Sequence, residues 1–372
     1  MKKAFRLLAA LLALLLLLTS CSLPLKEPES KNGEVAKRPN IIENYGLKVF
    51  LSAQDDQAKE NLFALYHAMA NFEKTCYLPY PMPQDRVQGL LALLCYECPE
   101  LFQVDLTKPT SYHSYEGQID VIAVDFPYCM DKATYDDLLA QAKQALTQFD
   151  TAGMTILEAE EYIYDILCHK ITYNATSTHS ANVYGALVES QAKCDGISKA
   201  MKWAMENAGF SCMCVDGHPH EGGVGHAWNI IPVDGHYYHV DLTADVQSES
   251  RHEPYYPAYN VSADFMLSVY APSTYFNIPE EQDMSASYHA AKGNFFTAGA
   301  NWKSALKKLF KEAHKSNGTF TVQFATQTDF DSCTASLESV FREAAREAGI
   351  QHWSWGTTYI SQYHLLSVKV QK

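Results

Sequence analysis

A two-residue turn signal, Asp234-Gly235, is the feature that most constrains the fold. It lies between two runs that we expect to be strands, over residues 226–233 and 236–243. Asp-Gly favours a type I′ turn, whose twist matches that of two antiparallel strands. We therefore expect the two runs to form a β-hairpin with a two-residue loop. A loop one residue longer would turn one strand over and exchange its two faces.

The hairpin register gathers polar residues on one face of the strands. It places His226 opposite Thr243 and Trp228 opposite Asp241, so that all four side chains point to the same side. His226 and Asp241 are then diagonal neighbours with Cα atoms roughly 7–8 Å apart, which lets the carboxylate accept a hydrogen bond from the imidazole. The other face carries residues that suit burial, namely Ala227, Ile231, Val233, Tyr238, Val240 and Leu242.

A cysteine, Cys194, stands at the start of a helix that we expect over residues 194–208. The unpaired N–H groups and the positive end of the helix dipole favour a thiolate there. Asp195 partly opposes this effect, so a nucleophilic Cys194 still needs a base. The apolar face of the helix and the glycine that follows it support the prediction: Ile197, Ala200, Met201, Ala204, Ala208 and Gly209.

A complete cysteine-based mechanism is possible if Cys194 faces His226. The imidazole would take the thiol proton, and Asp241 would orient the ring and stabilise the imidazolium. The thiolate would attack a carbonyl to give a thioester, which water or an amine would resolve. The backbone N–H of Cys194 is one oxyanion donor, and Gln191 and Tyr184 are candidates for the second.

Residues 180–245 resemble the core of the transglutaminase-like superfamily, which is related to the papain-like fold. The shared pattern is a Y-G-x-L turn, then x-C-x-G-x-[ST]-x-A, H-A-W-N and [HY]-x-D-x-T, found here at Tyr184–Leu187, Cys194–Ala200, His226–Asn229 and His239–Thr243. The resemblance implies an α+β fold in which the nucleophile helix packs on an antiparallel sheet. It also implies a catalytic triad of nucleophile, base and orienting residue, formed by Cys194, His226 and Asp241.

Family membership leaves the reaction open. Members of this superfamily crosslink glutamine to lysine, cleave peptide bonds, remove glycans from asparagine or have lost activity. Ile197 and Ala244 stand where members often carry aromatic residues, so one wall of the substrate groove differs. Trp228 is either a structural wall beside the triad or a substrate contact. We expect acyl transfer from a protein or peptide amide, with hydrolysis slightly favoured, and a catalytically silent surface binding or scaffold protein as the alternative.

The N-terminus resembles the signal of a bacterial lipoprotein. Three cations precede an apolar run over Leu7–Leu18, which is too short to cross ~30 Å of hydrocarbon as a helix. The sequence Leu18-Thr19-Ser20-Cys21 resembles a lipobox, and this implies cleavage after residues 1–20 and acylation of Cys21. Residues 21–45 are then a lipidated cysteine and a flexible tether. We expect anchoring to the outer face of the cell membrane.

Composition limits the partners and the cofactors. The formal net charge of −14 argues against nucleic acid, which leaves a protein or peptide substrate, with cell-wall material as one candidate, and the membrane through the lipid. Lipidation of Cys21 leaves nine of the ten cysteines, so at least one stays free or pairs between chains. Zinc binding by Cys95, Cys98, Cys212 and Cys214 is an alternative to buried thiols. We expect no metal and no cofactor.

We divide the chain beyond the tether into three regions. Residues 46–150 form an N-terminal α+β accessory region, residues 151–290 the catalytic core, and residues 291–372 a C-terminal α+β accessory domain. Periodicity predicts helices over residues 46–80, 84–98, 133–148, 155–170, 194–208, 300–314 and 335–348. It predicts strands over residues 118–126, 210–216, 226–233, 236–243, 319–325, 357–361 and 363–370.

Overall fold

The computed structural model describes residues 44–220, 222–248 and 254–372. The predicted signal peptide, Cys21 and almost all of the predicted tether lie outside the described residues. The last tether residue, Tyr45, instead begins helix α2, which Asn44 caps by accepting a hydrogen bond from the Leu47 N–H at 2.9 Å. Within the described ranges, the helices are all too short or too polar to cross a membrane.

The N-terminal region contains an antiparallel sheet in the order β1-β3-β2. Helix throughout residues 46–80 is a wrong prediction, because the chain leaves the helix at Phe72, whose φ is 57°, and continues as a strand. Cys76 and Leu78 are buried and Tyr77 between them is exposed, as in a strand with one covered face. The elements are α2 (Tyr45–Phe50), η2 (Leu51–Ala53), α3 (Asp56–Ala70), β1 (Thr75–Met82), α4 (Gln84–Glu97), β2 (Ser111–Ser114), β3 (Val121–Asp125), α5 (Lys132–Ala145) and η3 (Leu146–Gln148).

The central sheet is antiparallel, in the order β8-β7-β6-β9. The predicted hairpin register is confirmed, since Val233 pairs with His236. Strand β8 nevertheless ends earlier than predicted, because the Asp241 N–H turns away from β7 and donates to the Ala258 carbonyl at 2.8 Å. The strands are β6 (Met213–Pro219), β7 (His226–Val233), β8 (His236–Val240) and β9 (Tyr270–Pro272).

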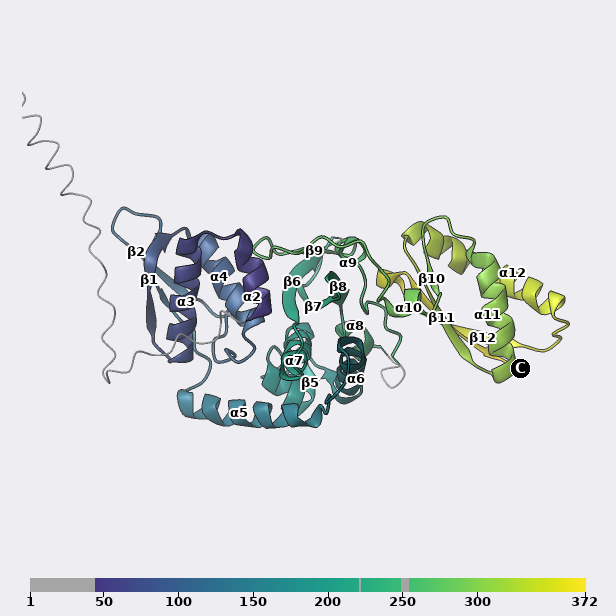
Figure 1. The fold of residues 1–372 in the computed structure, drawn as a ribbon, viewed down its shortest axis with the longest axis horizontal. Helices are drawn as coiled ribbons and strands as arrows, with labels where there is room; N and C mark the ends of the chain where they lie inside the picture. Colours follow the sequence, from purple (N-terminus) through teal and green to yellow (C-terminus); the bar gives the residue numbers. More distant parts are fainter. Residues whose placement is uncertain (1–43, 221, 249–253) are drawn as a thin grey trace, which may run out of the picture. The chain divides into compact units, whose positions relative to one another are not determined.

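A helix covers the central sheet and carries Cys194 on its first turn. Helix α7 packs against β6, β7 and α6, and Figure 1 shows α6 and α7 near these strands. Thr155 and Glu158 form a capping box that starts α6, while Gly209, with φ of 87°, follows the end of α7 as predicted. The elements are α6 (Ile156–Lys170), β4 (Thr172–Tyr173), η4 (Gly185–Glu189, one π-helical turn), β5 (Gln191–Ala192), α7 (Cys194–Asn207), α8 (Thr243–Val246), α9 (Ala263–Leu267) and α10 (Tyr288–Ala291).

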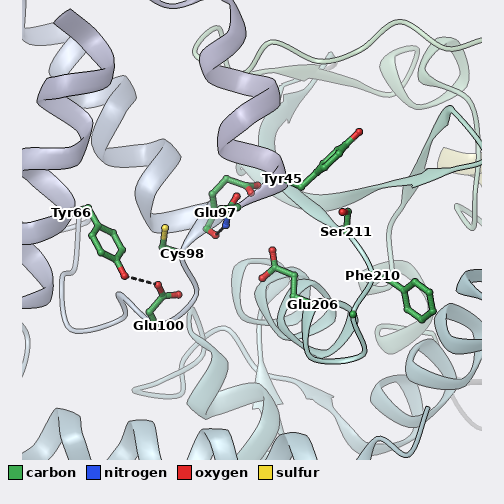
Figure 2. A pocket seen from close by; sticks show the side chains of 10 residues that line it. Tyr45, Tyr66, Glu97, Cys98, Glu100, Glu206, Phe210 and Ser211 are labelled. Carbon is green, nitrogen blue, oxygen red and sulfur yellow. Dashed lines mark hydrogen bonds between the residues drawn. The ribbon is translucent and has the colours of Figure 1, made fainter. Parts of the chain in front are cut away.

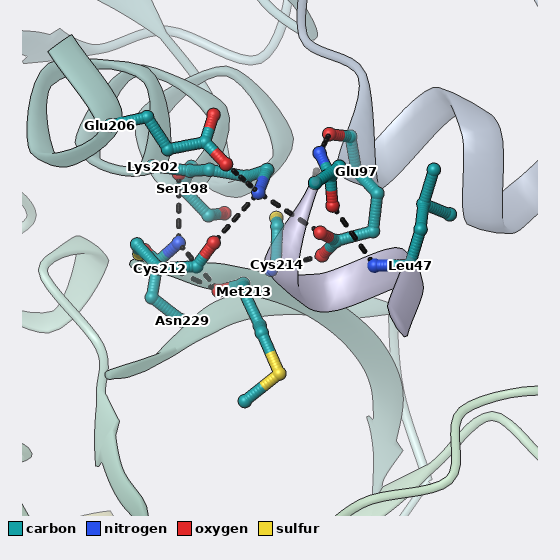
Figure 3. A network of polar contacts seen from close by, with 10 residues as sticks. Leu47, Glu97, Ser198, Lys202, Glu206, Cys212, Met213, Cys214 and Asn229 are labelled. Atoms are coloured by element: carbon teal, nitrogen blue, oxygen red, sulfur yellow. Dashed lines mark hydrogen bonds and ion pairs between the residues drawn. The ribbon is translucent and has the colours of Figure 1, made fainter. Parts of the chain in front are cut away.

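A buried ionic cluster joins the N-terminal region to α7 and β6 (Figure 3). Lys202 Nζ lies 2.9 Å from Glu97 Oε2 and 2.6 Å from Glu206 Oε1. It also donates to the Cys212 carbonyl at 2.7 Å, while the Cys214 N–H donates to Glu97 Oε1 at 2.7 Å. Because Lys202 and Glu97 are both fully buried, each needs the other as a counterion. The cluster therefore fixes α4 against the helix that begins with Cys194.

The C-terminal region has its own sheet in the order β10-β11-β13-β12 and its own hydrophobic cluster. Helix α12 begins earlier than predicted because Thr326 caps it, accepting from the Asp329 N–H at 3.2 Å. Tyr363, in a turn between two strands, packs instead with the cluster of the N-terminal region and central sheet. The elements are β10 (Phe295–Phe296), α11 (Trp302–Ser316), β11 (Thr319–Phe324), α12 (Gln327–Glu347), β12 (Ser354–Ile360), η5 (Ser361–Tyr363) and β13 (Leu365–Gln371).

Candidate active site

Cys194 occupies the first position of α7, where the sequence places it. Lys193 precedes it in extended conformation, so the helix N–H groups begin at the cysteine. Gly196, two residues after Cys194, allows close packing, because a Cβ atom there would lie 2.4 Å from the Ser180 carbonyl oxygen. Cys194 is 6% exposed. The local sequence thus sets the thiol at a positive helix end, just below the surface.

The carboxylate next to the thiol is neutralised by neighbouring groups. Asp195 Oδ2 lies 2.7 Å from Lys193 Nζ, and Asp195 Oδ1 accepts a hydrogen bond from the Tyr96 hydroxyl at 2.8 Å. Burial alone would raise the pKa of Asp195, but the positive charges of Lys199 and Lys193 lower it below its ordinary value. The opposing effect of Asp195 on a Cys194 thiolate is therefore compensated.

His226 and Asp241 meet as the hairpin register predicts. His226 Nε2 lies 2.7 Å from Asp241 Oδ2, and the two side chains are 15% and 2% exposed. Burial alone would lower the pKa of His226, but the charge and hydrogen bond of Asp241, followed by a hydrogen bond with Cys194, raise it to about 10. Since Asp241 engages Nε2, Nδ1 is the ring nitrogen left to face the sulfur. The structure thus brings all three predicted triad residues together.

Asp241 is held by partners that sequence reasoning missed. Its Oδ1 accepts from the Thr243 N–H at 3.0 Å, and its Oδ2 accepts from the Tyr363 hydroxyl as well as from His226. Burial would raise the pKa of Asp241, yet the His226 charge and these hydrogen bonds keep it below its ordinary value. The Tyr270 ring stacks on His226 with centroids 4.8 Å apart. No local pattern marks Tyr363 or Tyr270, because both contacts are set by tertiary packing.

Trp228 is a wall of the site and lies behind it. It is 1% exposed, and its Nε1–H donates to His239 Nδ1 at 2.9 Å. Of the two alternatives for Trp228, the structural wall fits this burial, and direct substrate contact does not. Ile197 is also fully buried, so the residue that replaces a family aromatic there belongs to the core.

The two candidate oxyanion donors make contacts elsewhere. The Tyr184 hydroxyl donates to Gln141 Oε1 at 3.4 Å. Gln191 is exposed, and its Oε1 accepts from Asn174 Nδ2 at 2.8 Å. Tyr173 on β4 is the residue whose pKa is raised by burial and then by the charge of Cys194. Tyr173 therefore lies near the thiol, whereas the side chains of Tyr184 and Gln191 have their contacts elsewhere.

Two cavities border opposite ends of α7. A cavity of about 790 Å³ is lined by Lys193, Asp195 and Lys199 at the end that carries Cys194. Another of about 580 Å³ is lined by Glu97, Glu100 and Glu206, and Figure 2 shows the Tyr66 hydroxyl bonded to Glu100 beside it. Glu206 lies twelve residues after Cys194, or about 18 Å along the helix. The larger cavity therefore lies at the end of α7 where Cys194 is found, although its lining is formed by the neighbours of Cys194 and not by the thiol itself.

Eight cysteines besides Cys194 lie in the described ranges. No disulfide joins the nine cysteines there, and no group of three or more His, Cys, Asp or Glu side chains is arranged to hold a metal ion. Burial raises the pKa of the Cys95 thiol to about 11 and that of Cys214 further. The four cysteines of the zinc alternative are not grouped to hold a metal ion within these ranges.

One segment of the chain matches a family model. Residues 141–242 match the model described as the transglutaminase-like superfamily. No curated protein compared with the chain matches it. Among solved structures, the chain is similar to a TGase (12% identity, TM-score 0.27, 36% of this chain and 43% of the other covered).

Two further solved structures show the same level of similarity. One is a proposed cysteine protease from Cytophaga hutchinsonii (12% identity, TM-score 0.25, 36% and 61% covered). The other is a proposed protease from Parabacteroides distasonis (12% identity, TM-score 0.22, 36% and 39% covered). The chain spans less than two thirds of the length of each of these three proteins. The family resemblance therefore rests on residues 141–242, the segment that the transglutaminase-like superfamily model matches.

Proposed function

We propose that this protein is a cysteine acyl-transfer enzyme that acts on amide bonds of a protein or peptide. The observation that carries the proposal is the contact of 2.7 Å between His226 Nε2 and Asp241 Oδ2, beside a thiol at the start of α7. The raised pKa of His226 keeps the ring protonated at neutral pH. An imidazolium next to Cys194 stabilises a thiolate, which is the nucleophilic form of cysteine.

The reaction begins from this thiolate–imidazolium pair. The Cys194 sulfur attacks the carbonyl carbon of the amide, and the N–H of Cys194 donates to the oxyanion that forms. The imidazolium of His226 then gives its proton to the departing amine nitrogen as the C–N bond breaks, which leaves a thioester. Water or a second amine attacks the thioester and loses a proton to His226. The C–S bond breaks, the acyl product leaves, and the ion pair is restored.

The fate of the thioester separates a hydrolase from a crosslinking enzyme. Water gives hydrolysis and an amine gives transfer, by the same residues. The cavity of about 790 Å³ is lined by Lys193 and Asp195, the residues on either side of Cys194 in the chain. We favour hydrolysis slightly. A catalytically silent binding protein remains the competing proposal, and it predicts that Cys194 is dispensable.

An acyl-transfer assay on casein tests the proposal. The full chain is incubated with casein, with or without a dansylated amine, and incorporated label, released ammonia and new N-termini are followed. We expect at least one product with the wild type and none above background with Cys194→Ala. The matched control is Cys129→Ala, which removes an exposed cysteine and leaves activity unchanged. Equal product from the wild type and Cys194→Ala would contradict the proposal.

We also propose that the enzyme works outside the cytoplasm as a lipoprotein. The support is the sequence around Cys21, with its preceding cations and apolar run. Expressed in a bacterium with lipoprotein processing, the chain should partition into the membrane fraction with lipid on Cys21. Cys21→Ala should remain an unacylated precursor. A wild-type mature protein that starts elsewhere and carries no lipid would contradict this proposal.

A further inference from the structure

A tyrosine from the C-terminal region reaches the centre of the candidate site. The Tyr363 hydroxyl donates to Asp241 Oδ2, the same oxygen that accepts from His226 Nε2. Tyr363 is 1% exposed, so water does not compete for this hydrogen bond. The two residues are separated by 122 positions in the chain. The contact therefore exists only when the C-terminal region is folded and packed against the core.

The backbone around Tyr363 is anchored at several points. Gln323 Nε2 on β11 donates to the carbonyl oxygens of Tyr363 and Pro257, at 3.1 and 2.6 Å. The Phe324 N–H donates to the His364 carbonyl at 3.1 Å. These bonds tie η5 both to the sheet of its own region and to the loop of the core that contains Pro257. The hydroxyl is thus presented to Asp241 by a rigid turn.

A second contact from the same turn holds the ring that covers His226. Gln362 Nε2 donates to the Tyr270 hydroxyl, and the Tyr363 and Tyr270 hydroxyls lie 3.4 Å apart. Tyr270 in turn stacks on His226. Two adjacent residues of the C-terminal region therefore contact both groups that hold the His226 ring. Tyr363 bonds to the carboxylate at the edge of the ring, and Gln362 bonds to the tyrosine stacked on its face.

We propose that Tyr363 is a positioning residue of the active site, which holds the Asp241 carboxylate in line with His226, and that the C-terminal region thereby completes the triad. This inference rests on the proposed function. An ionised carboxylate can accept several hydrogen bonds, and Asp241 has one to Oδ1 and two to Oδ2. Without the tyrosine donor, the Asp241 carboxylate can rotate away from the His226 ring, and the ionised form of the carboxylate is less stable.

The surroundings of Asp241 make Tyr363 the donor whose removal is easiest to interpret. The titratable groups that face the carboxylate are His226 from β7, Tyr270 from β9, Tyr363 from η5 and Tyr164 from α6, with Asp245 of α8 on the same segment. Asp245 is occupied by the N–H groups of Tyr255 and Tyr256 and by another tyrosine hydroxyl. Tyr363→Phe removes one donor to Asp241 and keeps a ring of the same size in the packed interior.

The test is the pH dependence of Cys194 alkylation by iodoacetamide in the full chain, with the site identified by mass spectrometry. Tyr363→Phe should lower the rate at neutral pH about 10-fold, the typical effect of one hydrogen bond to a charged group. It should also move the acid side of the pH–rate profile to higher pH. The reason is that Asp241 then stabilises the His226 imidazolium less, and the imidazolium in turn stabilises the Cys194 thiolate less. Tyr359→Phe, an exposed tyrosine of the same region, should reproduce the wild-type profile.

A double-mutant cycle separates positioning from general loss of structure. If Tyr363 acts through Asp241, Tyr363→Phe should have little further effect in an Asp241→Asn background. A fully additive effect would overturn the inference. So would a Tyr363→Phe protein with lowered thermal stability but the wild-type pH profile, because that result is expected of a purely structural tyrosine.

The outcomes also separate this inference from the proposed function. A wild-type Cys194 that reacts no faster than Cys129 at about pH 6 would contradict the enzyme proposal itself. A rapidly reacting wild type whose profile is unchanged by Tyr363→Phe would overturn only the role of Tyr363 and leave the triad in place.

Discussion

Two histidines on neighbouring strands, one partly buried and one fully buried, have opposite proton affinities. His226 begins β7 and His239 lies on β8, and both rings are 6.4 Å from the Trp228 ring. Burial lowers the pKa of His239 to about 3. The same effect acts on His226, but Asp241 outweighs it and raises the pKa to about 10.

The partner, and not the depth of burial, decides what each histidine can do. His239 Nδ1 accepts a hydrogen bond from the Trp228 Nε1–H, which requires that this nitrogen carries no proton. His226 has a carboxylate at Nε2 and a thiol near its other nitrogen, which favours the cationic ring. One histidine is therefore a structural acceptor, and the other is suited to acid–base chemistry.

Removing the carboxylate should make the two histidines alike. In Asp241→Asn, burial still acts on His226 without the compensating charge, so its pKa should fall from about 10 to below about 6.5. This is a change of more than 10³-fold in proton affinity. The pKa values of His226 and His239 are measured by NMR titration of the ring signals. A His226 pKa that stays above about 9 in the variant would break the comparison.

Exchanging each histidine in turn should separate their roles next. His226→Gln should slow iodoacetamide alkylation of Cys194 at about pH 6 by ~10²-fold, because no imidazolium then stabilises the nucleophilic thiolate. His239→Gln should change the rate less than about twofold, since the amide oxygen of glutamine can still accept from Trp228. Similar losses in both variants would show that His239 shares in the chemistry.

Acid stability should show the smallest of the three effects. The folded-state pKa of His239 lies below its unfolded value of about 6.5, so the unfolded chain takes up a proton that the folded chain refuses. Stability is therefore lost as the pH falls from about 6.5 toward 3, by about 2 kcal/mol at pH 5 from this residue. His239→Gln should lose that much less between pH 8 and pH 5 in denaturant titrations.

The same titrations carried to alkaline pH test the opposite sign for His226. Its folded-state pKa is raised, so its stabilising contribution is fully present below about pH 6.5 and is lost as the pH rises toward 10. His226→Gln should lack this alkaline loss. Parallel pH curves for the wild type and both variants would contradict the assigned pKa values.

The parts of the site that lie close together in the sequence could be predicted from it. The Asp234-Gly235 turn fixes the register, and the register places His226 near Asp241. The helix start places Cys194 at positive N–H groups. These inferences succeed because turn chemistry and periodicity are local and each leaves few alternatives.

The parts that depend on distant contacts were missed. Tyr363 is one of 23 tyrosines, and nothing near it in the sequence marks it as a partner of Asp241. Strand β1 was taken for helix, because the run before it has helical periodicity and only the left-handed Phe72 separates the two. The early end of β8 follows from a hydrogen bond to Ala258, a residue on a loop that periodicity does not describe.

The central claim, that Cys194 is a thiolate held by a protonated His226, is tested most directly by the ultraviolet absorbance of the thiolate. The difference in absorbance between the wild type and Cys194→Ser is followed from acid to alkaline pH. The account predicts one thiolate's worth of extra absorbance already present at about pH 6, which alkylation of Cys194 removes. A difference that develops only above about pH 8 would contradict it, because Cys194 would then be an ordinary thiol.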